Sequence, residues 1–173
     1  MKRAEERSTS PASVLSSRDV ADIRSMVERA YLSVRDYLDN PDTDEDSTTF
    51  TSNLANLVAQ WTRDTGLRAE VSVLGGERLL APRAKFHVLQ IVLEALANVA
   101  KHAYAHHTWV TIETTEGAVM VKVRDDGRWF LSSQPRGHGL GIMTERAALV
   151  GATVEVRSVP GEGTEVVITC PCE

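Results

Sequence analysis

The sequence predicts an α+β fold, a two-layer α/β sandwich in which helices cover one face of a mixed sheet. Helical and strand-like segments are mixed along the chain, and three of the expected strand pairs are hairpin-like, so the sequence does not fit a repeated βαβ design. The chain has 173 residues, which at about 150 residues per domain allows one domain with a short extension.

The composition excludes several classes of protein. Lys and Arg number 19 against 24 Asp and Glu, a net charge of −5, which argues against a nucleic-acid partner. Two cysteines one residue apart, Cys170 and Cys172, are too few for a disulfide framework and are expected to be reduced thiols. No apolar run approaches about 18 residues and no apolar stretch follows the first residues, so we expect a cytoplasmic chain without direct membrane contact.

The N-terminal third is expected to lie outside the main domain. Residues 1–15 are polar and charged and predict a disordered tail. Residues 16–40 predict a helix, which begins at a capping-box type of start, Ser16 and Asp19. Its apolar residues form one narrow seam, typical of a helix packed on another helix, either in a second copy of the chain or in its own domain: Val20, Ile23, Val27, Ala30, Val34 and Tyr37.

The helix is expected to end at Asn40-Pro41, where an acidic linker, 41–51, leads into a domain spanning 52–173. Gly66 is the expected stop of the first helix of this domain, and Pro82 is expected in the first turn of a long helix. In order, the sequence predicts a helix over 52–64, a strand over 69–74, a helix from 82 to about 104, strands over 108–115 and 118–124, a Gly-rich stretch over 125–139, a helix over 140–150, and strands over 153–159 and 165–170.

A first cluster of candidate functional residues lies on the long helix. Glu94, Asn98 and His102 are one turn apart and share a face, and Lys101 lies beside that face. A carboxylate, an amide oxygen and a cation in this arrangement can hold a hydrated Mg²⁺ and neutralise phosphate oxygens. The alternative is an ordinary solvated face of a helix.

Two further clusters follow it. In Asp125-Asp126-Gly127-Arg128 a strand breaks into a carboxylate pair and a glycine, where a buried carboxylate can accept a hydrogen bond from an exocyclic amine. The run Gly137-His138-Gly139-Leu140-Gly141 leads into a helix and can present backbone N–H groups to an anion. Each pattern alone is weak, since the first is also an ordinary Asp-Gly turn. The chain has no P-loop and no Rossmann fingerprint.

Taken together and in this order, the three clusters resemble the first three characteristic sequence motifs, or boxes, of the Bergerat (GHKL) ATP-binding fold. They are similar to those of sensor histidine kinases of the nitrate-sensor and DesK-like subfamily. The resemblance covers about residues 50 to 171 and includes a last box, Gly161-Glu162-Gly163-Thr164. Residues 34–38 of the predicted N-terminal helix resemble the second helix of that family's dimerisation hairpin.

The resemblance implies a role for each residue of the long helix. Asn98 would bind the Mg²⁺ that bridges the phosphates, with Lys101 and His102 near the phosphate tail. Glu94 stands where related ATPases have a carboxylate that orients the attacking group, so Glu94 and Asn98 are the expected catalytic residues.

The resemblance also implies roles for the later boxes. Asp125 would read the adenine amine, with Gly127 beneath the ring and the Thr164 hydroxyl supporting the adenine from the last hairpin. The hinge of a mobile lid over the phosphates would form at the third box, whose ATP-binding residues are Gly137, Gly139, Leu140 and Gly141.

Two features depart from the family pattern. Trp129 stands where the second box usually has another glycine, which puts normal ATP affinity in doubt. In addition, none of the five histidines precedes the ATP-binding domain, so the phospho-accepting helix is not found in this chain: His87, His102, His106, His107 and His138. A metal site on His102, His106 and His107 is not favoured, because no acidic or cysteine ligand is nearby.

The resemblance implies the ATP- and Mg²⁺-dependent catalytic domain of a two-component sensor histidine kinase, which phosphorylates a histidine outside this segment. The implied partners are a histidine-bearing dimerisation segment, a response regulator and a second copy bound through residues 20–38. Such a domain would be cytoplasmic, either by itself or as the cytosolic part of a longer membrane-anchored sensor. Two alternatives are a stand-alone serine kinase of the anti-sigma-factor type and a degenerate module that only binds partners.

Overall fold

The computed structural model describes residues 49–76, 80–127, 138–159 and 161–172. The predicted tail (1–15), the predicted N-terminal helix (16–40) and most of the acidic linker (41–51) lie outside the described residues. The described elements are α2 (Phe50–Thr65), β1 (Arg68–Leu74), α3 (Pro82–Asn98), η1 (Val99–Ala103), β2 (His107–Thr114), β3 (Ala118–Asp125), α4 (His138–Ala148), β4 (Thr153–Val159) and β5 (Gly163–Pro171).

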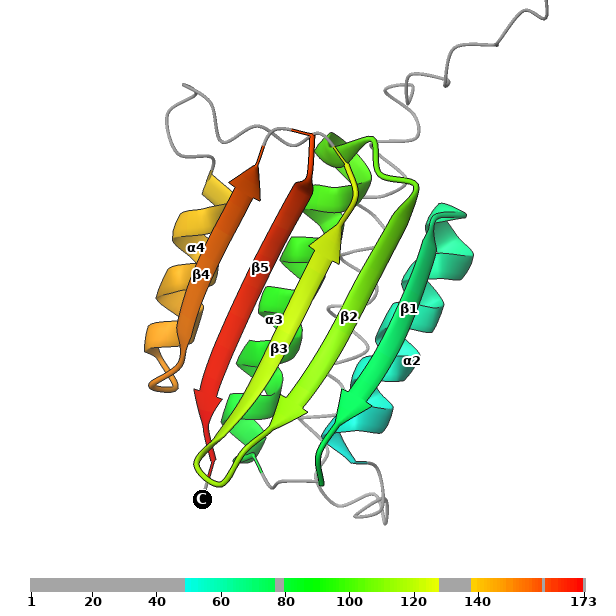
Figure 1. Ribbon diagram of the computed structural model, residues 1–173. Coiled ribbons are helices and arrows are strands. Elements are labelled where there is room, and N and C mark those ends of the chain that lie inside the picture. Colours follow the sequence, from blue (N-terminus) through cyan, green and yellow to red (C-terminus); the bar gives the residue numbers. More distant parts are fainter. Residues whose placement is uncertain (1–48, 77–79, 128–137, 160, 173) are drawn as a thin grey trace, which may run out of the picture.

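Five strands form one mixed sheet in the order β1-β2-β3-β5-β4. The pair β1 and β2 is parallel, whereas β2 and β3, β3 and β5, and β4 and β5 are antiparallel. The described α-helices α2, α3 and α4 all lie against one face of this sheet (Figure 1). The predicted two-layer α+β sandwich is therefore confirmed. Of the three antiparallel pairs, β3 and β5 do not form a hairpin, because α4 and β4 lie between them in the chain.

Helix α2 begins two residues earlier than predicted, because Thr49 caps it: the Ser52 N–H donates to the Thr49 hydroxyl oxygen at 3.2 Å. It ends as predicted at Gly66, whose φ of +71° suits glycine. One face is buried, with Phe50, Leu54, Val58 and Trp61 in the core. This apolar face attaches α2 to the sheet, and the helix lies beside β1 (Figure 1).

Helix α3 is the central element of the helical layer and is buried over most of its length. Its core residues include Val88, Ile91, Val92 and Leu96, all inaccessible to solvent. The predicted single helix from Pro82 to about Tyr104 is confirmed as one continuous helical segment, but its last five residues form the π-helix η1. A π-turn is wider than an α-turn and is frequent at functional sites. The segment ends at Tyr104, whose φ is +49°.

The ends of β3 and β5 meet beside the C-terminal half of α3. Strand β3 runs one residue further than predicted, to Asp125, and β5 begins two residues earlier, at Gly163. Asp125 pairs with Thr164 in the antiparallel register of these strands. Gly163 has a φ of +92°, and a Cβ there would collide with the Asp125 carbonyl. Only glycine therefore allows β5 to approach Asp125 so closely.

None of the described helices combines the length and the apolar character needed to cross a membrane.

Candidate functional site

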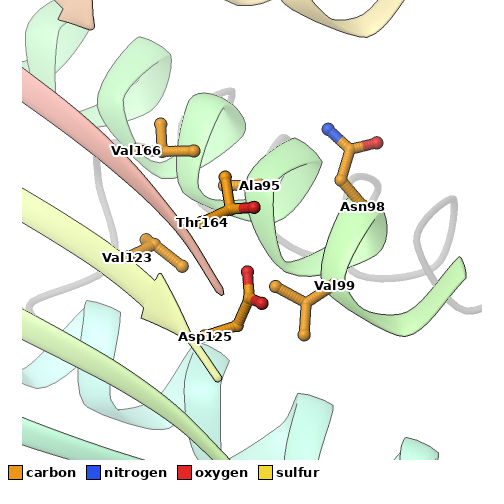
Figure 2. A pocket seen from close by; sticks show the side chains of 7 residues that line it. All are labelled: Ala95, Asn98, Val99, Val123, Asp125, Thr164 and Val166. Carbon is orange, nitrogen blue, oxygen red and sulfur yellow. The ribbon is translucent and has the colours of Figure 1, made fainter. Parts of the chain in front are cut away.

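The candidate site is a pocket between α3 and the ends of β3 and β5 (Figure 2). Because strand side chains alternate between faces, residues two apart on each strand project toward α3 together. The cavity volume is about 10 Å³, enough for about one water molecule. Four apolar and three polar residues line it: Ala95, Val99, Val123 and Val166, with Asn98, Asp125 and Thr164.

Asp125 is the buried carboxylate of this pocket, with 4% of its surface exposed. Burial raises the pKa of its carboxyl group, the neighbouring Asp126 adds to the increase, and hydrogen bonds from the backbone of Gly127 and Thr164 oppose it. The Gly127 N–H donates to Asp125 Oδ1 at 2.8 Å. A buried carboxylate with a perturbed pKa in a pocket is typical of a functional site.

Thr164 reaches the same pocket from β5 and has 4% of its surface exposed. Its hydroxyl donates to the Ser158 hydroxyl oxygen at 3.2 Å, which connects the start of β5 to β4. In Figure 2 the Asp125 carboxylate points toward Thr164 and α3. The structure therefore brings together two of the residues predicted from the sequence, although 38 residues separate them in the chain.

The polar edge of α3 adjoins this pocket and meets the first turn of α4. A Cβ on Gly139 would lie 2.7 Å from Glu94 Oε1 and 3.5 Å from Asn98 Nδ2. Glu94 and Asn98 are both partly buried, and the Asn98 amide points away from Asp125 in Figure 2. Three predicted residues from two helices thus lie close together. Glu94 and Asn98 each carry a side-chain oxygen of the kind that Mg²⁺ prefers.

The remaining predicted residues lie around these two groups or outside the described residues. Lys101 is partly buried in η1, shortly after Asn98 in the chain, and Leu140 packs against the core from α4. Gly127 is buried, while Gly141 is exposed with open space at its Cβ position. Gly137, Trp129 and the side chain of His102 lie outside the described residues. In the part of the chain that the structure describes, no three His, Cys, Asp or Glu side chains are grouped as a metal site.

Sequence reasoning assigned no role to Asp126 or to the apolar wall of the pocket. By their spacing Ala95 and Val99 belong to the apolar side of the long helix, and periodicity does not distinguish a core residue from a pocket lining. Asp126 accepts hydrogen bonds at Oδ1 from the backbone N–H groups of His106, at 2.8 Å, and His107, at 2.9 Å. An Asp-Gly turn signal was visible, but it does not reveal a partner 20 residues away.

Comparison with known proteins supports a relationship to ATPases of signalling proteins. Residues 84–173 match the family described as "Histidine kinase-, DNA gyrase B-, and HSP90-like ATPase". The chain is 37% identical over 87 residues to the sensor histidine kinase LiaS of Bacillus subtilis (strain 168), a match that covers 49% of this chain and 24% of LiaS. It is 26% identical over 157 residues to the histidine-protein kinase/phosphatase DegS of Brevibacillus brevis, covering 89% of this chain and 41% of DegS. The chain thus spans less than half the length of these relatives.

Solved structures show the same fold. The histidine kinase domain of the blue-light activated histidine kinase from Erythrobacter litoralis EL346 superposes with a TM-score of 0.69 at 19% identity, covering 87% of this chain and 75% of that chain. The mycobacterial sensor histidine kinase MprB gives a TM-score of 0.55 at 19% identity, covering 73% of this chain and 96% of that chain.

Proposed function

Because the chain belongs to the histidine kinase-, DNA gyrase B-, and HSP90-like ATPase family, we propose that its domain 52–173 is the catalytic domain of a sensor histidine kinase. In this proposal the domain binds ATP with Mg²⁺ and transfers the γ-phosphoryl group to a histidine outside this segment. The observation that carries the proposal is the buried carboxylate of Asp125 in the pocket beside α3.

The pocket supplies the adenine half of the proposed site. Asp125 accepts a hydrogen bond from the exocyclic amine of adenine, Gly127 lies beneath the ring, and Thr164 supports the base with its hydroxyl. The apolar side chains of Val99 and Val123 contact the faces of the ring. Since the cavity of about 10 Å³ is smaller than a purine, binding includes a rearrangement of the side chains that line it.

The polar edge of α3 and η1 supplies the phosphate half. The amide oxygen of Asn98 would hold Mg²⁺, which would supply positive charge to neutralise the phosphate oxygens. Lys101 and His102 neutralise the phosphate tail from the same segment. In this proposal the third box forms a lid over the phosphates, with its hinge at Gly137, Gly139, Leu140 and Gly141. A Cβ added to Gly139 would lie 2.7 Å from Glu94 Oε1, which supports placing the start of α4 beside the phosphate half.

The proposed reaction is an in-line displacement. An imidazole nitrogen of the acceptor histidine attacks the γ-phosphorus, the bond to the bridging oxygen of the β-phosphate breaks, and ADP leaves with that electron pair. Glu94 orients the imidazole and accepts its N–H proton. The domain contributes mainly by holding the two groups in line.

The proposed partners follow from this reaction. All five histidines lie at residue 87 or later, inside the ATP-binding domain, so a histidine-bearing dimerisation segment must supply the acceptor. A response regulator would receive the phosphoryl group, and a second copy would bind through residues 20–38. The sensor kinases LiaS and DegS among the relatives support this assignment. We place the reaction in the cytoplasm, where ATP is available.

Calorimetric titration with a non-hydrolysable ATP analogue, with and without Mg²⁺, tests the nucleotide site. We expect micromolar binding by the wild type and none by Asp125→Asn. The carboxylate only accepts hydrogen bonds, whereas the asparagine amide would also present an NH₂ donor to the adenine amine. Absence of binding by the wild type would contradict the proposal and favour a module that only binds partners.

Incubation with ATP and a purified histidine-bearing hairpin tests the transfer step. The expected product is a phosphohistidine, which is labile in acid. An acid-stable phosphoprotein would instead indicate a serine kinase, and normal nucleotide binding without any labelling would exclude transfer as the function.

A further inference from the structure

The carboxylate of Asp126, directly after β3, is hydrogen-bonded to the backbone at the start of β2. Asp126 Oδ1 accepts hydrogen bonds from the N–H groups of His106 at 2.8 Å and His107 at 2.9 Å. The backbone N–H of Asp126 donates to the His107 carbonyl at 3.3 Å, so both the side chain and the main chain of Asp126 contribute to this connection.

The two N–H groups that donate to Asp126 come shortly after a residue whose backbone conformation is rare for residues other than glycine. Tyr104 ends η1 with a φ of +49°, in the left-handed region that disfavours bulky residues. Its side chain is 70% exposed, so burial of the ring does not offset this unfavourable conformation. Neighbouring contacts must hold such a residue in place. The hydrogen bonds of Asp126 to residues 106 and 107 are contacts of this kind.

The carboxylate of Asp126 is suited to this task because it stays ionised. Desolvation of the carboxylate acts to raise its pKa, but the hydrogen bonds from the backbone N–H groups of His107 and His106 outweigh that effect and hold the pKa below the ordinary value. Hydrogen bonds to an ionised acceptor are roughly twice as strong as those between neutral groups.

The connected segments carry the two halves of the proposed nucleotide site. Lys101 in η1 and Asn98 just before it belong to the phosphate half, and the loop after η1 leads directly to the two N–H groups. On the other side, Asp125 precedes Asp126 and faces the pocket. Asp126 is the first residue after β3; it is exposed and does not line that pocket.

We propose that Asp126 is a positioning residue that fixes the phosphate-binding end of α3 and η1 relative to the adenine-binding Asp125. This inference rests on the proposed function, because it concerns the same nucleotide site. Asp126 touches neither nucleotide nor metal in this scheme; it acts through the backbone of residues 106 and 107 and through Asp125.

The experiment compares Asp126→Ala, Asp126→Asn and the matched control Asp64→Ala. Asp64 is an exposed carboxylate on α2 that accepts a hydrogen bond from Gln60 at 2.8 Å, so its removal also deletes one charge and one side-chain hydrogen bond. Titration with the Mg²⁺-bound, non-hydrolysable ATP analogue gives the affinity. NMR amide exchange in the nucleotide-free protein gives the protection of His106, His107 and Gly127.

We expect Asp126→Ala to bind the analogue about tenfold or more weakly, because small misplacements of binding groups are costly. Asp126→Asn keeps an acceptor oxygen and should stay within about threefold of wild type, the loss reflecting the missing charge. Asp64→Ala should bind as wild type does. In Asp126→Ala, amide exchange should accelerate at residues 106 and 107 and also at Gly127, whose N–H reports on Asp125.

Three results would overturn the proposal: wild-type affinity in Asp126→Ala, equal losses in Asp126→Asn and Asp126→Ala, or an equal loss in Asp64→Ala. If the wild type binds no nucleotide, the proposed function fails, but amide exchange still decides the structural part. Unchanged protection of Gly127 in Asp126→Ala would then refute positioning of Asp125, whereas faster exchange would support it.

Discussion

At the scale of single residues, two adjacent carboxylates have opposite effects on stability. The pKa of Asp125 is raised above the ordinary 3.8, mainly by burial, whereas hydrogen bonds to Asp126 lower its pKa below that value. A raised pKa means that the folded state holds the proton more tightly, so stability falls as the pH rises above the unfolded value. Asp126 has the reverse sign: it stabilises the fold above the unfolded pKa, and this stabilisation is lost as the pH falls through its folded pKa.

We therefore predict that Asp125→Asn raises the thermal midpoint of the nucleotide-free protein by a few degrees at pH 7, although it removes nucleotide binding. The amide carries no charge to desolvate, and the difference from wild type should shrink as the pH is lowered toward about 4, near the pKa of an unfolded aspartate. Asp126→Asn should lower the midpoint at pH 7. Calorimetric scans between these pH values test both signs, and a lower midpoint in Asp125→Asn would contradict this account.

A second prediction separates backbone strain from steric collision at the last hairpin. Gly161 and Gly163 both have positive φ, +84° and +92°, but a Cβ on Gly161 meets nothing within 4 Å, whereas one on Gly163 collides with the Asp125 carbonyl. We expect Gly161→Ala to destabilise the fold by about 1 to 2 kcal/mol from conformation alone. Gly163→Ala should destabilise it by more than about 4 kcal/mol, a range reached when packing is disrupted. Equal losses in urea unfolding would show that β5 can move away from Asp125.

At the scale of elements, α3 serves both the core and the site. Its buried face was predictable from apolar periodicity, and its polar edge from the spacing of Glu94 and Asn98. The conversion of its last turn to the π-helix η1 was not predictable, because apolar periodicity does not distinguish one π-turn from an α-turn. The first turn of α4 then packs against the polar edge, with Gly139 as the point of contact.

This contact predicts a measurable coupling between α3 and α4. Gly→Ala in a helix normally stabilises by about 0.5 to 1 kcal/mol, and we expect this gain at Gly141, whose Cβ position is open. At Gly139 the added methyl would lie 2.7 Å from Glu94 Oε1, so the gain should be smaller or absent. Combining Gly139→Ala with Glu94→Ala should restore it, which a double-mutant cycle in urea detects. Identical gains at both glycines would contradict the contact.

At the scale of the whole molecule, the sheet order decides which parts of the chain meet. Strand β5 inserts between β3 and β4, so the box ending in Thr164 lies beside Asp125, and α3 covers both. Residues 20–38 lie outside the part of the chain that the structure describes. The apolar seam of those residues therefore stays a prediction of a helix that binds a second copy of the chain.

We predict that the chain dimerises through this seam. Val27 lies in the seam, whereas Glu28 lies on another face of the predicted helix. Light scattering should give a dimer for the wild type and for Glu28→Ala, and a monomer for Val27→Asp, because a buried unpaired charge is strongly unfavourable at such a seam. A monomeric wild type at high concentration would refute dimerisation.

The sequence by itself determined the elements and the candidate residues. Caps, stop signals and periodicity act within a few residues, so the helix stop at Gly66, the strands and the polar edge of α3 were predictable. The order of the boxes indicated the family before any geometry was available. Only the tertiary structure decided that β3 pairs with β5 and that Gly163 must be glycine. It also decided that Asp126 is hydrogen-bonded to the start of β2 and that Gly139 lies close to Glu94. Each of these depends on contacts between residues far apart in the chain, and these contacts form only when burial of the common core brings their elements together.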